Sequence, residues 1–255
     1  MLPHESISAA IESANAEKRT GLVPFITAGY PEPTEFLDTL RAVARFGDVV
    51  EIGVPFSDPM ADGMTIQRSS YVAIEKGVTL TWIFDQLESV KGEINTPIVF
   101  MSYLNPLLAF GFENLAQRAM QTGVCGFIVP DLPFEECAEI KDALEAKGIG
   151  LIQLVTPATP PDRLQMLAKE SRGFLYAVTI TGITGGDVGL PDNLADYLDK
   201  VSKISPLPVC AGFGIRTAND VVSVGKHAAG AIVGSALVEV LESGDDPAAF
   251  LKQLR

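Results

Sequence analysis

The sequence predicts a single α/β domain, a (β/α)8 TIM barrel with an extra N-terminal helix. Apolar, β-branched runs alternate with amphipathic helical segments along the chain, and there are eight such runs in 255 residues. The runs are apolar throughout, which is typical of parallel strands that are covered on both faces. A doubly wound sheet would show the same alternation, and the count of eight favours the barrel. No linker or low-complexity stretch interrupts residues 1–255, so we expect one domain.

The elements follow in order. The segment HESISAAIESANAEKR has helical period and precedes the first strand, so we expect it to cover the bottom of the barrel. Three later helical segments carry start or stop signals: TEFLDTLRAVARFG begins at Thr34 and ends at Gly47, EECAEIKDALEAKG ends at Gly148, and PPDRLQMLAKES begins at Pro160 and Pro161. The eight predicted strands are Leu22–Ala28, Val49–Val54, Ile98–Tyr103, Gly126–Pro130, Gly150–Thr156, Phe174–Thr179, Pro208–Gly212 and Gly230–Gly234.

A long, polar, glycine-rich stretch, TITGITGGDVGLP, follows the sixth predicted strand. Reactive groups of such barrels lie at the C-terminal ends of the strands and in the loops after them. A long loop at this place predicts an active-site lid.

Composition restricts the possible partners. The formal net charge is -13, and so acidic a surface repels nucleic acid and anionic membranes, which we therefore do not expect as partners. Apolar runs such as AIVGSALVEVL are too short to span a membrane, and MLPHESISAA lacks the features of a secretory signal, so we expect a cytoplasmic protein. Cys125, Cys137 and Cys210 are odd in number and far apart, which predicts buried free thiols.

One carboxylate interrupts the second predicted strand, VVEIGV. In a parallel barrel strand, the side chain of Glu51 is expected to point into the barrel. Loss of solvent there would raise its pKa and suit it to general acid–base catalysis near neutral pH. The alternative is a buried ion pair with a basic group on another strand, but none of the predicted strands contains Lys or Arg.

A second carboxylate, Asp62, follows in the turn DPMADG, where Asp58 is a competing acid. An Asp before Gly is often only a turn former. At the same strand end as Glu51, however, Asp62 could flank a shared ligand and act on a second atom of it.

Two glycine-containing turns predict a phosphate site. Gly212 and Gly214 follow the seventh predicted strand in AGFGIRTANDV, and Gly234 and Ser235 follow the eighth in AIVGSALVEVL. The loops after strands seven and eight commonly bind phosphate in barrels, through backbone N–H groups and a helix N-terminus. A glycine in one such turn can be purely geometric, but two at the expected places indicate a site that captures an anion despite the acidic surface.

The sequence lacks the residue patterns that several other kinds of catalysis require. The two histidines, His4 and His227, lie far apart, so we expect no metal site. No predicted strand contains a Lys for a Schiff base, and no dinucleotide or P-loop fingerprint is present. The sequence therefore predicts metal-free acid–base chemistry on a phosphorylated small molecule.

Seven stretches carry a family resemblance across nearly the whole chain: LVPFITAGYP, EIGVPFSDPMADGMTIQRS, IVFMSYLNP, FIVPDLPFEE, TGITGG, GFGIRT and VGSALV. In this order they resemble the tryptophan synthase alpha subunit family. The resemblance implies a lyase that cleaves indole-3-glycerol phosphate to indole and glyceraldehyde 3-phosphate, a retro-aldol reaction in the last steps of L-tryptophan biosynthesis. It also implies that Glu51 protonates the indole C3 carbon and accepts the proton of the glycerol hydroxyl. Asp62 would bind the indole N–H and stabilise positive charge on the ring.

The resemblance implies further binding residues. The indole pocket and lid would be formed by Phe25, Ile66, Met101, Ile128, Tyr176 and Thr184, although a plain apolar core also explains the aliphatic and phenyl side chains among them. The phosphate would be bound by Gly185, Phe213, Gly214, Gly234 and Ser235, mostly through backbone N–H groups.

The resemblance also implies a partner, a pyridoxal-phosphate beta subunit that receives indole through a tunnel in an alpha2beta2 hetero-tetramer. The cofactor would belong to that partner, with none in this chain. Pro55, Asp58, Asn105 and Pro106 would face it. Two alternatives stay open: a stand-alone lyase that releases free indole, and a catalytically silent barrel that activates a beta subunit.

Overall fold

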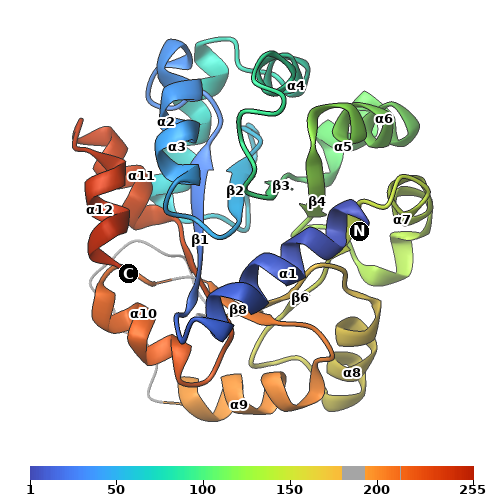
Figure 1. Ribbon diagram of the computed structural model, residues 1–255. Helices are drawn as coiled ribbons and strands as arrows, with labels where there is room; N and C mark the ends of the chain where they lie inside the picture. The colour runs from blue at the N-terminus through green and yellow to red at the C-terminus, as the bar shows by residue number, and fades with distance from the viewer. Residues whose placement is uncertain (180–192, 213) are drawn as a thin grey trace.

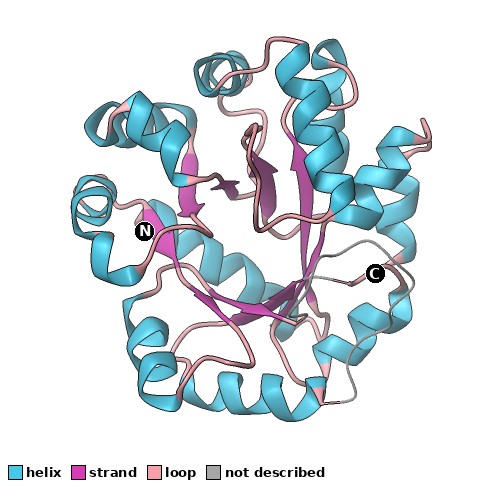
Figure 2. Ribbon diagram, turned by 180° about the vertical axis from the view of Figure 1, so that it is seen from behind, coloured by secondary structure: helices cyan, strands magenta, loops and turns pink. Residues whose placement is uncertain are grey.

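The computed structural model describes residues 1–179, 193–212 and 214–255. Most of the predicted lid falls outside these ranges. Within them, the strands form the centre and the helices surround them, as Figures 1 and 2 show from opposite sides.

All strand pairs are parallel, in the order β5-β4-β3-β2-β1-β9-β8-β7-β6. The strands are β1 (Gly21–Thr27), β2 (Val50–Gly53), β3 (Ile98–Met101), β4 (Val124–Ile128), β5 (Gly150–Ile152), β6 (Leu154–Val155), β7 (Leu175–Val178), β8 (Val209–Gly212) and β9 (Gly230–Val233). Each of the eight predicted strands is present, and the barrel is confirmed.

The fifth predicted strand differs from the expectation because Gln153 divides it into β5 and β6. The first half pairs with β4 and the second half with β7. The backbone N–H of Gln153 donates to the Ser171 hydroxyl (2.9 Å), and its carbonyl accepts from the N–H of Tyr176 (3.0 Å). Both edges of the sheet thus belong to one short segment, which closes the barrel.

The helices alternate with the strands and form the outer layer. They are α1 (Pro3–Ala16), α2 (Phe36–Ala44), α3 (Met64–Glu75), α4 (Leu80–Ser89), α5 (Leu104–Phe110), α6 (Phe112–Thr122), α7 (Ala138–Glu145), α8 (Pro161–Glu170), α9 (Leu194–Ile204), α10 (Ala218–Gly225), α11 (Ser235–Glu242) and α12 (Pro247–Gln253). The predicted helix start at Thr34 is wrong by two residues, because Pro33–Glu35 forms a 3-10 turn ahead of α2.

Helix α1 closes the bottom of the barrel, as predicted, and crosses the strands in Figure 1. Ile7 and Ile11 are fully buried and pack with the inward side chains of the strands. Their burial stabilises the fold by about 2–3 kcal/mol each. Polar groups of α1 also bond to residues just before three strands, as in the bond from the Ser8 hydroxyl to the Gly173 carbonyl (2.5 Å). With this end sealed, a ligand has to approach from the C-terminal ends of the strands.

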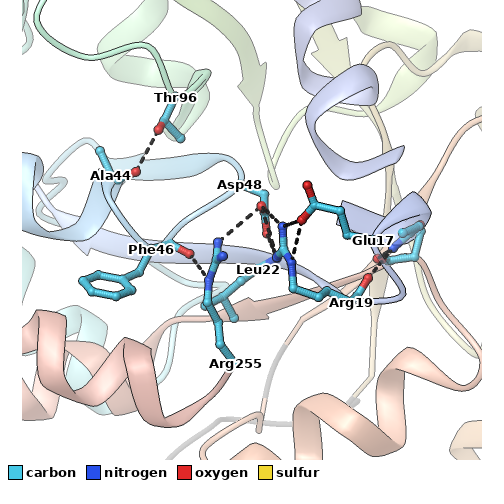
Figure 3. Close-up of polar contacts among 10 residues, drawn as sticks. Glu17, Arg19, Leu22, Ala44, Phe46, Asp48, Thr96 and Arg255 are labelled. Carbon is cyan, nitrogen blue, oxygen red and sulfur yellow. Dashed lines mark hydrogen bonds and ion pairs between the residues drawn. The ribbon is translucent and has the colours of Figure 1, made fainter. Parts of the chain in front are cut away.

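A polar network holds the same end together (Figure 3). The carboxylate of Asp48, just before β2, accepts the backbone N–H of Leu22 (2.8 Å) and contacts the guanidinium groups of Arg19 (3.4 Å) and Arg255 (3.3 Å). Arg255 also donates to the Phe46 carbonyl (2.7 Å). The network joins the starts of β1 and β2 to the end of the last helix.

All three cysteines are buried and free, as predicted. Within the described part of the chain, no helix combines the length and apolar character that crossing a membrane requires.

Candidate active site

Glu51 lies inside the barrel on β2. Its neighbours along the strand, Val50 and Ile52, pack outward with the helices, so strand alternation points Glu51 inward. It is 1% exposed, and no hydrogen-bond partner within the described residues reaches its Oε2 atom. Neither Lys nor Arg forms an ion pair with it among those residues. The alternative of a buried ion pair therefore finds no support there.

Burial makes Glu51 a proton donor at neutral pH. Loss of solvent, aided by the negative charge of Asp62, raises the pKa of Glu51 to about 8. The carboxyl group is then mostly protonated at pH 7, although an ordinary glutamate would be ionised.

Asp62 lies in the loop between β2 and α3 and is half-buried. Its Oδ2 atom accepts the hydroxyl proton of Tyr103 (3.0 Å), and its backbone carbonyl accepts from the Gln67 amide (2.8 Å). Burial raises the pKa of Asp62 to about 6, against the opposing effect of the Tyr103 hydrogen bond. Asp62 is thus mostly ionised where Glu51 is mostly protonated, a division suited to an acid and an electrostatic partner. The competing Asp58 is exposed.

Five of the predicted indole-pocket residues come together inside the barrel, where Phe25 on β1 is the register partner of Glu51 on β2. Phe25, Met101, Ile128 and Tyr176 are buried members of the cluster inside the barrel, and the half-buried Ile66 packs against it. Thr184, predicted for the lid, lies outside the described residues.

Two glycines make room for aromatic rings in this cluster. A Cβ atom at Gly53 would lie 2.4 Å from the Phe25 ring, and one at Gly212 would lie 2.3 Å from the Tyr176 hydroxyl oxygen. Sequence reasoning missed Gly53 and interpreted Gly212 as a turn residue. The sequence signal that could have found this role is a glycine at the inward position of a strand end, because it leaves room for a neighbouring ring.

The Tyr176 hydroxyl interacts electrostatically with both carboxyl groups. Burial, followed by the charges of Glu51 and Asp62, raises the pKa of its hydroxyl well above the ordinary value. The hydroxyl therefore stays protonated and can act as a donor.

Of the predicted phosphate residues, Gly214, Gly234 and Ser235 follow the ends of two adjacent strands, β8 and β9. Gly214 is half-buried and has a φ of 80°, a conformation that favours glycine. Ser235 begins α11 after Gly234, and among the described residues this N-cap position provides no side-chain cap. A Cβ atom at Gly234 would lie 3.8 Å from Phe25, so this helix start borders the apolar cluster inside the barrel. Gly185 and Phe213 lie outside the described residues.

Of the predicted partner-facing residues, Pro55 and Asp58 lie in the loop after β2, and Asn105 and Pro106 lie in the first turn of α5, after β3. Asp58 and Asn105 are exposed, Pro106 is half-buried and Pro55 is buried. No cluster of three His, Cys, Asp or Glu side chains suited to a metal ion occurs in residues 1–179, 193–212 and 214–255.

Known proteins resemble the chain over nearly its full length. Residues 11–255 match the family model described as Tryptophan synthase alpha chain. The tryptophan synthase alpha chain of Nitratidesulfovibrio vulgaris (strain DP4) is 42% identical over 243 residues, or 95% of each chain. That of Bacillus cereus (strain AH820) is 43% identical over 244 residues, covering 94% of this chain and 92% of the relative.

Solved structures agree with these relatives. A structure of Mycobacterium tuberculosis tryptophan synthase has a TM-score of 0.89 at 32% identity, covering 97% of this chain and 96% of that one. Tryptophan synthase subunit alpha from Legionella pneumophila str. Paris has a TM-score of 0.88 at 31% identity, covering 100% and 97%.

Proposed function

The chain belongs to the tryptophan synthase alpha chain family, and on this premise we propose that it is a lyase that cleaves indole-3-glycerol phosphate to indole and glyceraldehyde 3-phosphate. The observation that carries the chemistry is the buried Glu51, whose pKa of about 8 lies above that of about 6 for Asp62. One acid is available to give a proton while the other is available to hold a positive charge.

The reaction follows from these protonation states. Protonated Glu51 donates its proton to C3 of the indole ring, and the ring nitrogen takes up the positive charge. Ionised Asp62 accepts the ring N–H in a hydrogen bond and stabilises that charge. The bond from C3 to the side-chain carbon then breaks, and its electron pair returns to the ring. The hydroxyl on the departing carbon becomes the aldehyde and returns its proton to Glu51, so the carboxyl group ends as it began.

Binding follows the same geometry. The apolar cluster of Phe25, Met101 and Ile128 offers a dry surface for the indole ring. The turn at Gly214 and the uncapped start of α11 at Ser235 offer N–H groups for the phosphate. We assign Thr184 to the indole pocket and lid, and Gly185 and Phe213 to the phosphate site, from the family resemblance alone.

The substitution Glu51→Gln tests the proposal. An amide of the same shape cannot exchange the proton, so we expect indole release to fall by about two to four orders of magnitude while substrate binding is retained. Assays of indole release measure the turnover, and equilibrium binding measures the affinity for the substrate. Normal turnover by this variant would exclude the role of Glu51, and the absence of turnover in the unaltered protein would favour the silent barrel.

Two controls separate chemistry from folding. Glu113→Gln makes the same change at an exposed position on α6 and should leave turnover unchanged. The raised pKa of Glu51 means that its contribution to stability is present below about pH 4.5 and is lost as the pH rises through about 8. Glu51→Gln should therefore unfold at a temperature at least as high as the unaltered protein at pH 8.

We propose that the chain works as the alpha subunit of a cytoplasmic alpha2beta2 hetero-tetramer, with pyridoxal phosphate held only by the beta partner. The exposed Asp58 and Asn105 follow the C-terminal ends of β2 and β3, in the loop after β2 and at the start of α5. Exposed apolar side chains lie nearby in sequence: Met60 (88%) in the same loop, Met64 (61%) at the start of α3 and Leu108 (58%) on α5. Measuring turnover with and without a beta subunit distinguishes the readings. Strong activation supports the hetero-tetramer, and high unaided turnover supports a stand-alone lyase.

A further inference from the structure

The side chain of Tyr103 is held at a fixed place beside Asp62. Tyr103 lies between β3 and α5 and is 5% exposed. Its hydroxyl donates to Asp62 Oδ2 (3.0 Å) and accepts the backbone N–H of Ala61 (2.9 Å). The hydroxyl therefore contacts both the carboxylate and the backbone just before it.

Two further contacts fix Tyr103, one on its ring and one on the adjacent backbone. Phe56, in the loop after β2, stacks on it with centroids 5.2 Å apart and planes inclined by 28°. The next residue, Leu104, donates its N–H to Asp131 Oδ1 (2.9 Å), which anchors the start of α5 to the loop after β4. Loops after three strands thus determine where the hydroxyl lies.

We propose that Tyr103 is a positioning residue whose hydroxyl orients the Asp62 carboxylate toward the ring N–H of the substrate. This inference rests on the proposed function. Oδ2 accepts from Tyr103, and within residues 1–179, 193–212 and 214–255 no hydrogen bond reaches Oδ1, which can therefore accept the substrate N–H. A hydrogen bond to the ionised form also keeps the carboxylate charged, which its electrostatic role requires.

The substitution Tyr103→Phe removes the oxygen and keeps the ring that stacks on Phe56. We expect kcat to fall about tenfold with a smaller change in KM, because the lost contact aligns a group that acts in the transition state. Because the Tyr103 hydrogen bond lowers the pKa of Asp62, its loss should move that pKa above about 6. The acid limb of the kcat/KM profile and 13C NMR of labelled aspartate carboxyl groups both report the shift.

Tyr197→Phe is the matched control. Its hydroxyl donates to the Val155 carbonyl (2.9 Å) on the helix-facing side of the barrel, and burial raises its pKa as it does for Tyr103. Removing this oxygen should leave kcat and the acid limb unchanged.

A double-mutant cycle with Asp62→Asn completes the test. If Tyr103 acts through Asp62, then Tyr103→Phe should lower kcat by less than twofold in the Asp62→Asn background. A tenfold loss in that background, or an unmoved pKa of Asp62, would overturn the proposal. The NMR titration needs no turnover, so failure of the inference remains distinguishable from failure of the proposed lyase activity.

Discussion

Glu51 and Asp62 show how one barrel mouth gives two carboxyl groups different protonation states. Both lose solvent, but Asp62 gains a hydrogen bond from Tyr103, whereas Glu51 gains a negatively charged neighbour. The first effect lowers a carboxyl pKa and the second raises it. The separation of the two pKa values therefore comes from the deeper burial of Glu51 together with the different neighbours of the two groups.

This separation predicts a bell-shaped pH dependence of kcat/KM for indole release. Activity should rise with pH as Asp62 ionises near pH 6 and fall as Glu51 loses its proton near pH 8. Initial rates at low substrate concentration between pH 5 and 9 measure both limbs.

The variant Asp62→Asn provides the control for that profile. Its residual activity should lose the acid limb, and its alkaline limb should move to lower pH, because the negative charge that raises the pKa of Glu51 is gone. An alkaline limb that stays in place would show that the two groups do not interact.

At the scale of elements, the proposed site divides the binding of the substrate between strand ends and helix starts. Strands β1 to β4 and β7 present the apolar and acidic side chains, whereas the turns after β8 and β9 present backbone. Because backbone N–H groups carry no net charge, the phosphate can be held without a dedicated cation next to the acids.

Gly234→Asp tests the turn after β9. A side chain fits there, since a Cβ atom would have ordinary contact at 3.8 Å with Phe25, so the variant should fold. Its carboxylate would repel the phosphate at the start of α11, and we expect KM to rise at least about tenfold with a smaller change in kcat. Gly234→Ala adds the methyl group without the charge and should change KM little. An equal rise in KM for both variants would contradict the assignment of the phosphate to this turn.

Element order was predictable from the sequence, whereas several side-chain pairings were not. Continuous apolar runs indicated the strands, and the strand VVEIGV placed Glu51 at an inward position. The break at Gln153 depends on which strand lies on each side, and that is a property of the closed barrel. The bond between Tyr103 and Asp62 joins residues 41 positions apart, and its geometry depends on the stacking of Phe56. No periodicity in the sequence reports such contacts.

On the scale of the whole molecule, the two ends of the barrel have separate tasks. The proposed reactive groups lie toward the C-terminal ends of the strands, and α1 seals the opposite end. The Asp48 network lies at the sealed end, where it joins Arg19 and Arg255 through a carboxylate that is 11% exposed (Figure 3). Stability and activity should therefore respond separately to changes at the two ends.

Asp48→Asn tests this separation. The amide can still accept the Leu22 N–H but loses the charge that attracts two guanidinium groups, so we expect the free energy of unfolding to fall by about 1–3 kcal/mol. Because the network is remote from the barrel mouth, kcat/KM should stay within about twofold of the unaltered protein. Urea unfolding and initial rates measure the two quantities. Asp38→Asn, which alters an 86% exposed carboxylate paired with Arg41, should cost less than about 1 kcal/mol. A loss of kcat/KM by Asp48→Asn under conditions where the variant is fully folded would show that the sealed end also shapes the active site.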